Sequence, residues 1–276
     1  MLLPQETIFR SLKIIRHTQI IRDVEHIADL VARLAERQKQ ITIISWVNAH
    51  TLTVAQKDSD LAISLLRSTI LLRDGVGISV LFRLLGRDAG INLNGTDWIP
   101  RILRLHAGRR VALLGSREPY LSKAAEAVEK LGCRVALRMD GFQEPEVYTR
   151  QLVANDVDVV VLGMGVPKQH EVAHFLTNKL VRPVLILNGG AILDFMADRF
   201  PRAPKLWRRL RLEWLFRLTQ EPRRLWRRYT VGGVLFLFYT AQIIYAQKYK
   251  RGNTGLTVRE HQSSSRQGTV GEQNIG

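Results

Sequence analysis

The chain has 276 residues, of which 46% are hydrophobic, and its formal net charge is +16 at pH 7. The length and hydrophobic content indicate a globular protein with one α/β domain and an appendage, or with two small domains, and the charge indicates a polyanionic partner. The single cysteine, Cys133, excludes an internal disulfide and is typical of a reducing cytoplasm, and the first 17 residues lack the basic start and apolar run of a secretory signal.

Short apolar runs recur between residues 40 and 190, each followed by a small or polar turn and then a helical pattern. In chain order they lie in the segments ITIISW, STILL, RVALLGS, CRVALR, VDVVVLGMG and RPVLILNGG. Such β-branched and leucine-rich runs are typical of strands buried on both faces. Their alternation with helices predicts an α/β fold whose core, residues 1–200, is a Rossmann-like, mostly parallel sheet.

The turns that follow these runs are the expected place for a ligand, because parallel sheets bind ligands beyond the carboxyl ends of their strands. The turns contain Asn48, Asp74, Gly115, Ser116, Gly163, Gly165, Gln169, Asn188 and Gly189. Asp74 directly follows a buried run and precedes two glycines in "RDGVG". On the residues alone it fits a helix cap and a catalytic base equally well.

Three further motifs have simpler readings. In "LNGTDW", Thr96 or Asp97 is expected to cap a helix whose N-terminus would attract anions. "HEVAH" at residues 170–174 matches a zinc-protease pattern, but it falls in the first turns after a strand and no third ligand follows, so no metal site is expected. "GMG" at residues 163–165 is read as a tight turn, because Lys168 stands where a dinucleotide motif needs its third glycine.

The chain changes character after Phe200. Residues 199–251 carry 14 Lys and Arg against two acidic residues, and the arginines are mixed with tryptophan and leucine, a mixture typical of a membrane interface. Arg217, Arg224 and Arg227 share one helical face if the helical phase survives Pro222, and a fork of guanidiniums suits a diphosphate.

Residues 230–247 form an uncharged stretch of 18 residues, at the short limit for a membrane span. A buried or membrane-resting segment is favoured over a span. The sequence therefore predicts a basic, aromatic, helical appendage over residues 201–250 that completes the site and docks on a membrane. Residues 251–276, rich in Ser, Gln, Gly and Thr, are expected to be a disordered tail.

Together these motifs resemble the WecG/TagA/CpsF family of bacterial glycosyltransferases. The resemblance covers residues 40–230 and rests on "NAHT", "DGVG", "NGTDW", "GMGVPKQ", "NGGAILDF" and "RAPKLWRRLRLEWLFRLTQEPRRLWRRY". It implies an inverting, metal-independent transfer of a hexose or N-acetylhexosamine (N-acetylmannosamine, its uronic acid or glucose) from a UDP-sugar to an undecaprenyl-diphosphate-linked saccharide. The implied setting is exopolysaccharide or other cell-surface polysaccharide synthesis, with the enzyme held peripherally at the anionic cytoplasmic face of the bacterial inner membrane.

The resemblance also implies roles for individual residues. Asp74 becomes the general base, Asn48 and Gln169 become active-site residues, and the appendage arginines hold the UDP diphosphate. The expected substrate-binding residues are Thr51, Gly75, Asn94, Gly95, Thr96, Asp97, Gly115, Gly163, Gly165, Asn188, Gly189, Arg217, Arg224 and Arg227. Trp46 and His170 depart from the family, which has threonine and glutamate at these positions.

No cofactor and no metal are expected, and a homo-oligomer stays open. Two other classes remain as alternatives: a basic membrane- or nucleic-acid-binding protein, and an NAD-dependent oxidoreductase. The first is disfavoured as a nucleic-acid binder because the core shows no RNA- or DNA-binding motif, and the second because the glycine motif is incomplete.

Overall fold

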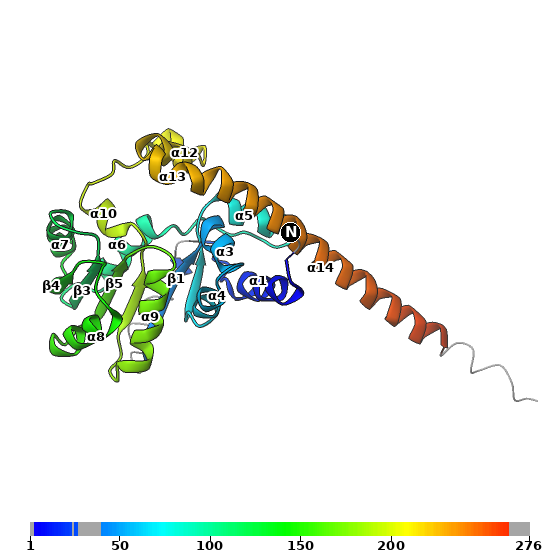
Figure 1. The fold of residues 1–276 in the computed structure, drawn as a ribbon, viewed down its shortest axis with the longest axis horizontal. Coiled ribbons are helices and arrows are strands. Elements are labelled where there is room, and N and C mark those ends of the chain that lie inside the picture. Colours follow the sequence, from blue (N-terminus) through cyan, green and yellow to red (C-terminus); the bar gives the residue numbers. More distant parts are fainter. Residues whose placement is uncertain (1–2, 24, 27–39, 265–276) are drawn as a thin grey trace, which may run out of the picture.

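The computed structural model describes residues 3–23, 25–26 and 40–264. Its core is a six-stranded sheet with strand order β2-β1-β6-β5-β3-β4, and every pair of neighbouring strands is parallel (Figure 1). The strands are β1 (Thr42–Val47), β2 (Ile70–Arg73), β3 (Arg110–Gly115), β4 (Arg134–Met139), β5 (Val159–Gly163) and β6 (Leu185–Asn188). The predicted Rossmann-like, parallel α/β core is therefore confirmed.

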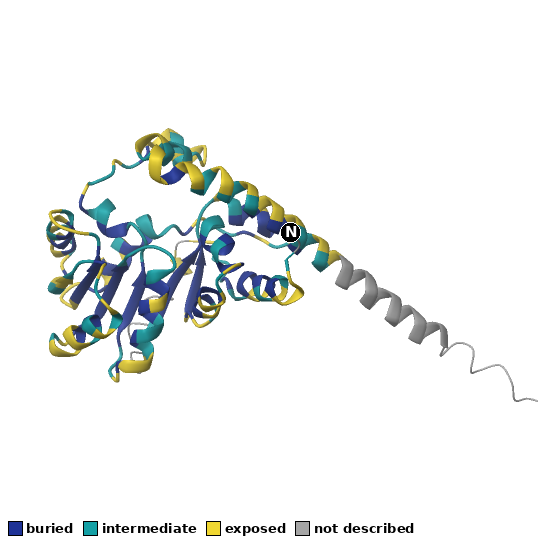
Figure 2. Ribbon diagram, viewed as in Figure 1, coloured by how far each residue is buried: buried dark blue, intermediate teal, exposed yellow. Residues whose placement is uncertain are grey.

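The inner strands are buried on both faces, as their uninterrupted apolar runs require. Residues 111–114 of β3 and 159–162 of β5 have no exposed surface, whereas the edge strand β4 exposes Arg134 and Arg138. Burial is concentrated in the strands and in the inner faces of the helices, and the appendage has few buried residues (Figure 2). The arginines on β4 suit a sheet edge, where charged side chains discourage pairing with another strand.

Helices cover both faces of the sheet. The core helices are α1 (Gln5–His17), α3 (Ala49–Ala55), α4 (Ser59–Leu66), α5 (Val76–Leu84), α6 (Gly95–Leu105), α7 (Tyr120–Lys130), α8 (Pro145–Ala154), α9 (Lys168–Lys179) and α10 (Ile192–Met196). Helices α6, α7 and α10 pack on one face, and α8 and α9 pack on the other. Helices α1, α3, α4 and α5 form a third apolar cluster with the β1–β2 end of the sheet.

The appendage is helical, as predicted. It consists of α11 (Lys205–Arg209), α12 (Glu213–Gln220), α13 (Pro222–Tyr229) and α14 (Val231–Ser264), and it crosses above the carboxyl ends of the strands before α14 projects beyond the core (Figure 1). The helical phase does not survive Pro222: Glu221 has φ −132° and ψ 58°, so α12 and α13 are separate helices.

One face of α14 packs on the core and the other is exposed. Phe236, Tyr239 and Ile243 are buried and spaced as one helical stripe, whereas the side chains of Val234 and Leu237 are 67% and 65% exposed. Within the described part of the chain, one helical segment, Pro222–Lys248, is long and apolar enough to cross a membrane, judged by length and composition alone.

The tail expected to be disordered from residue 251 differs in part from the structure. The backbone of α14 stays helical to Ser264, which the Ser-, Gln- and Gly-rich composition did not indicate. The remainder of that segment, residues 265–276, lies outside the described residues.

Candidate active site

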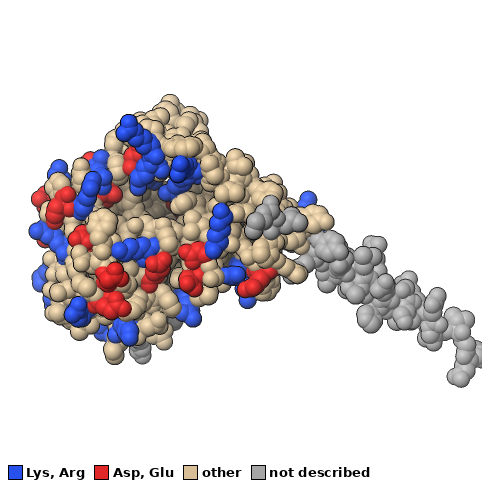
Figure 3. All heavy atoms as spheres, in the orientation of Figure 1, with Lys and Arg blue, Asp and Glu red and all other residues tan. Residues whose placement is uncertain are grey.

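A cavity of about 430 Å³ lies at the carboxyl ends of the strands, between the core and helices α12 and α13. Figure 3 shows this face hollowed beneath a group of Lys and Arg side chains. Most of the residues predicted from the sequence line it: Asn48, Thr51, Asp74, Gly95, Thr96, Gly163, Gly165, Gln169, Asn188, Gly189, Arg217 and Arg224. The turns after β1, β2, β5 and β6 are thus brought together with the appendage in one site.

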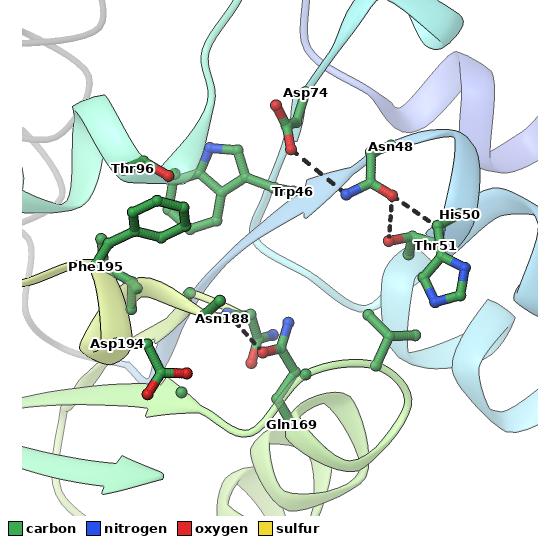
Figure 4. A pocket seen from close by; sticks show the side chains of 18 of the residues that line it. Trp46, Asn48, His50, Thr51, Asp74, Thr96, Gln169, Asn188, Asp194 and Phe195 are labelled. Atoms are coloured by element: carbon green, nitrogen blue, oxygen red, sulfur yellow. Dashed lines mark hydrogen bonds between the residues drawn. The ribbon is translucent and has the colours of Figure 1, made fainter. Parts of the chain in front are cut away.

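Asp74 lies on the wall of the cavity directly after β2. Its backbone N–H donates to the Val47 carbonyl (2.9 Å), and its Oδ2 atom accepts from Asn48 Nδ2 at 3.4 Å (Figure 4). The other amide atom, Asn48 Oδ1, accepts from the backbone N–H and the hydroxyl of Thr51 at 3.0 and 3.1 Å and so caps α3. The N-cap of α5 is Gly75 and not Asp74, so the Asp74 carboxylate is left to the cavity.

The surroundings of Asp74 act on its ionisation in opposite directions. Burial raises the pKa of the carboxyl above its ordinary value, and the hydrogen bond from Asn48 and the charges of Arg228, Arg217 and Arg73 oppose that rise. A carboxylate whose pKa is raised above the usual acidic range is better matched to taking a proton near neutral pH. The setting of Asp74 therefore suits a general base.

A buried polar network supports the opposite wall of the cavity. Gln169 Oε1 accepts from the Gly190 N–H at 2.8 Å, which ties the start of α9 to the turn after β6. Asn188 Nδ2 donates to Ser45 Oγ at 2.8 Å and lies 3.5 Å from Nδ1 of His170. Burial lowers the pKa of His170 to about 4, so this ring is neutral and serves as a hydrogen-bonding member of the wall.

The two histidines of "HEVAH" are separated in the structure. His170 is buried in the network just described, whereas Nε2 of His174 lies 2.6 Å from Nη1 of Arg67 on the outer side of α9. Within the described residues, no group of three His, Cys, Asp or Glu side chains is arranged to hold a metal ion.

Two glycines of the cavity are required by close packing against α10. A Cβ atom on Gly163 would lie 2.7 Å from the Leu193 side chain, and one on Gly189 would lie 2.2 Å from Ile192 Cγ2. Any side chain at either position would push α10 away from the sheet. The glycines thus let the first turn of α10 reach the cavity.

Some predicted substrate-binding residues, among them Gly115 and Gly75, do not line the cavity and have structural roles. A Cβ on Gly115 would meet the Gly163 backbone at 2.4 Å, so Gly115 allows β3 and β5 to approach each other. Gly75 donates its N–H to Asn92 Oδ1 at 2.8 Å.

The expected helix cap in "LNGTDW" was assigned to the wrong residue. The N-cap of α6 is Asn94, which has an extended backbone and accepts from the Asp97 N–H at 2.9 Å, so Thr96 and Asp97 lie inside the first turn. The Asp97 side chain accepts from Asn94 Nδ2 (2.8 Å) and pairs with Arg202 (2.6 Å). The side chains of Asn94 and Asp97 therefore both stabilise the start of α6 beside the cavity.

The cavity takes its positive charge from Arg217 of α12 and from Arg224 and Arg228 of α13. Arg227 does not line it: this side chain is exposed, and its guanidinium lies 5.5 Å from the ring centroid of Trp226. Within α13, Arg224, the buried Leu225 and Arg228 share the inner face, whereas Arg227, one residue and so about 100° away from Arg228 around the helix, turns outward. Arg228 is thus a cavity arginine that the sequence analysis, which placed Arg227 on this face, did not single out.

Two of the three guanidiniums of the cavity are free to bind an anion. Within the described part of the chain, neither Arg217 nor Arg228 donates a hydrogen bond or forms an ion pair, and the Nε atoms of both are buried without a partner. The Arg217 guanidinium lies over the ring of Phe195, 4.9 Å from the ring centroid, in a cation–π contact. Arg224 pairs with Glu221 at 2.6 Å.

Other lining residues were not singled out as site residues from the sequence. His50 lies in the first turn of α3, and burial, followed by the charge of Arg228, lowers its pKa to about 4, so it is neutral. Asp194 accepts from Ser116 Oγ (2.7 Å) and from Arg199 (3.1 Å). His50 lies within "NAHT", and Asp194 and Phe195 lie within "NGGAILDF". The sequence signal that could have found them was their place in motifs whose asparagines and glycines were already expected to line the site.

An ion-pair bridge joins the appendage to the core beside the cavity. Arg202 lies 2.6 Å from Asp97 at the start of α6 and 3.7 Å from Glu213 at the start of α12. Burial raises the pKa of Glu213, and the nearby Arg202 opposes that rise. The bridge fixes the start of α12, the helix that carries Arg217.

The comparisons with known proteins agree with this architecture. The model of the "Glycosyl transferase WecG/TagA/CpsF family" matches residues 15–252. The chain is also 28% identical over 196 residues to a protein of Bacillus subtilis (strain 168), across 69% of this chain and 76% of that protein. The Bacillus protein is named N-acetylglucosaminyldiphosphoundecaprenol N-acetyl-beta-D-mannosaminyltransferase. Because the family match spans most of its length, the chain belongs to the WecG/TagA/CpsF family of glycosyl transferases.

Proposed function

We propose that this protein is an inverting glycosyltransferase that moves a hexose or N-acetylhexosamine from a UDP-sugar to an undecaprenyl-diphosphate-linked saccharide. Membership of the family supports the reaction class, and the name of the Bacillus relative supports a lipid-diphosphate acceptor and an N-acetylmannosamine donor. The observation that carries the proposal is the cavity in which the Asp74 carboxylate faces three appendage arginines.

In the proposed reaction, Asp74 removes the proton from the acceptor hydroxyl as that oxygen attacks the anomeric carbon. The new C–O bond forms on the face opposite the diphosphate, the bond to the diphosphate oxygen breaks, and its electron pair leaves on UDP. Attack from the opposite face inverts the anomeric configuration. Asn48 holds the carboxylate at the cavity wall through its 3.4 Å contact.

Arg217, Arg224 and Arg228 would stabilise the negative charge that grows on the departing diphosphate. Guanidiniums bind phosphate oxygens through paired, charge-assisted hydrogen bonds, and the free N–H groups of Arg217 and Arg228 are placed for this task. Charge-stabilising donors of this kind contribute on the order of 10²–10³ to kcat. In this proposal the arginines supply the stabilisation that a divalent ion supplies in other transferases.

The outer surface of the appendage would hold the enzyme peripherally on the cytoplasmic face of the inner membrane, where a lipid-linked acceptor resides. Leu206, Leu210, Trp214 and Trp226 are 64%, 60%, 38% and 47% exposed, and the outer face of α14 adds further apolar side chains. Indoles favour the depth of lipid headgroups, and each nearby Lys or Arg contributes on the order of 1 kcal/mol on an anionic surface. A handful of such residues suffices for reversible docking.

A donor screen tests the proposal. Purified protein is incubated with a synthetic lipid-diphosphate N-acetylglucosamine and a panel of UDP-sugars, and products are read by mass spectrometry and by the anomeric NMR coupling. We expect one added sugar, with an anomeric configuration opposite to that of the donor. Transfer with retained configuration, or no transfer from any UDP-sugar, would overturn the proposal.

A further inference from the structure

Arg73, the last residue of β2, is a buried cation whose hydrogen-bond partners are neutral oxygens. Its side chain is 3% exposed, and it forms no ion pair with any described residue. Its guanidinium instead donates to neutral oxygens: Nε to the Ala89 carbonyl (2.7 Å), Nη2 to the Gly90 carbonyl (3.2 Å) and Nη1 to Ser79 Oγ (2.5 Å). Burying a charge costs free energy unless the charged group is hydrogen-bonded. These three oxygen acceptors supply the hydrogen bonds but, being neutral, leave the positive charge of Arg73 in place.

The same guanidinium also holds the residue that follows Asp74. Nη1 of Arg73 donates to the Gly75 carbonyl at 3.1 Å and lies 3.4 Å from Asn92 Oδ1, which in turn accepts the Gly75 N–H at 2.8 Å. Gly75 has φ +82°, a left-handed conformation that favours glycine. The Asp74 N–H is fixed to the Val47 carbonyl at 2.9 Å, so the backbone is held on both sides of the carboxylate.

Arg73 differs in position from the other cations that face Asp74. The charged and polar groups around that carboxylate are Arg73, Asn48 on the wall beside it, Arg217 and Glu213 of α12, and Arg228 of α13. Arg217 and Arg228 line the cavity, where a bound diphosphate would take up their charge. Arg73 is not part of the lining and its N–H groups are committed to protein oxygens, so no ligand in the cavity reaches it.

We propose that Arg73 is a positioning residue for Asp74. It fixes the backbone turn of residues 73–75. When the donor diphosphate neutralises the charge of the appendage arginines, Arg73 remains as the protein cation that favours the ionised form of the Asp74 carboxylate. This inference rests on the proposed role of Asp74 as the general base.

The test compares Arg73→Gln and Arg73→Lys with the wild type in a water-soluble acceptor assay over a range of pH. With Arg73→Gln we expect kcat to fall roughly ten- to hundredfold from lost positioning, while the donor KM changes less than about threefold. For Arg73→Gln, we also expect a shift in the acid limb of the kcat–pH profile, that is, the fall of kcat at low pH, which reports ionisation in the donor complex. This limb should move to higher pH, because removing a cation raises the pKa of the neighbouring Asp74 carboxyl. Arg73→Lys retains the charge, so its acid limb is expected to stay in place although kcat falls.

Arg87→Gln is the matched control. Arg87 belongs to the same region after α5, but its guanidinium lies over the Phe82 ring at 4.9 Å and donates to the Ile15 carbonyl, and no hydrogen bond or ion pair joins it to the turn of residues 73–75. We expect its kcat and its acid limb to match those of the wild type. Thermal unfolding and UDP binding by calorimetry show whether each variant is folded.

The outcomes separate the inference from the proposed function. A folded Arg73→Gln enzyme with wild-type kcat and an unmoved acid limb would overturn the role of Arg73, even if Asp74→Asn is inactive. Full turnover by Asp74→Asn would instead remove the base itself. Should Arg73→Gln fail to fold, Asn92→Ala keeps the charge and frees the Gly75 N–H, so a lower kcat with an unmoved acid limb supports the inference and an unchanged kcat contradicts it.

Discussion

Replacing Asp74 by asparagine removes the proposed base while leaving its shape and its neighbour in place. The contact that Asp74 makes with Asn48 is long, 3.4 Å, and an asparagine oxygen can still accept it, so less than about 0.5 kcal/mol of hydrogen bonding is lost. Loss of general base catalysis is expected to lower kcat by roughly 10²–10⁴, equivalent to about 3–5 kcal/mol in the activation barrier. The variant should still bind UDP, because all three cavity arginines remain.

The same substitution should make the protein more resistant to heat. Burial raises the pKa of Asp74 in the folded state above its ordinary value of 3.8, so the folded state binds this proton more tightly than the unfolded chain. The resulting stabilisation is present below pH 3.8 and is lost as the pH rises through the folded pKa. At neutral pH an ionised Asp74 therefore weakens the fold, and asparagine relieves that cost, so Tm is expected to rise.

The assay follows single turnovers with a soluble lipid-diphosphate analogue, calorimetry of UDP binding, and thermal unfolding at pH 7. Asp194→Asn is the control, since it makes the same chemical change in the same cavity at a carboxylate already engaged by Ser116 and Arg199. If Asp194→Asn abolishes transfer and Asp74→Asn does not, the base has been assigned to the wrong carboxylate. Equal losses of turnover and UDP affinity in Asp74→Asn would also refute the reasoning.

Further predictions follow from the appendage. Arg228→Ala should lower kcat/KM on a water-soluble acceptor by roughly 10²–10³, whereas Arg227→Ala on the same helix should change it by less than about threefold; equal effects would contradict the placement of α13. Leu237→Glu should weaken flotation with anionic vesicles without changing soluble-acceptor turnover, and an unchanged flotation would argue against membrane contact through α14. Arg202→Gln should lower kcat/KM by roughly tenfold, and adding Glu213→Gln should cost little more, because both belong to one ion-pair bridge; additive losses in the double-mutant cycle would show otherwise. EDTA should leave turnover unchanged, and loss restored by a divalent ion would show that the guanidiniums are not sufficient.

The fold could be predicted because its signals are local. Each strand is an apolar run such as "RVALLG" followed by a turn, and the confirmed parallel sheet follows from the alternation of such runs with helices. Because parallel sheets bind ligands beyond the carboxyl ends of their strands, the sequence also predicted one shared edge for Asn48, Asp74, Gln169 and Asn188, and these residues line the cavity. Their chemical roles stay predictions.

The remaining details depend on contacts that the sequence pattern does not show. Arg228 and not Arg227 lines the cavity because α13 turns the face of Arg224, Leu225 and Arg228 inward, an orientation that the run of arginines in "RRLWRR" does not show. The cap of α6 is Asn94 because its backbone is extended, a property that the polar string "NGTD" leaves open. The acceptors around Arg73 lie up to 19 residues further along the chain, so only the folded loop reveals them.

Helix α13 has eight residues, and its two sides face different surroundings. Leu225 is 2% exposed among the cavity residues, whereas the next residue, Trp226, is 47% exposed on the outside. Because α13 is short, we expect it to move as one rigid unit. A contact that fixes the Trp226 indole therefore also fixes the positions of the Arg224 and Arg228 guanidiniums on the other side of the helix. In the proposed membrane-docked enzyme, contacts of Trp226 with lipid would therefore also stabilise Arg224 and Arg228 in the cavity.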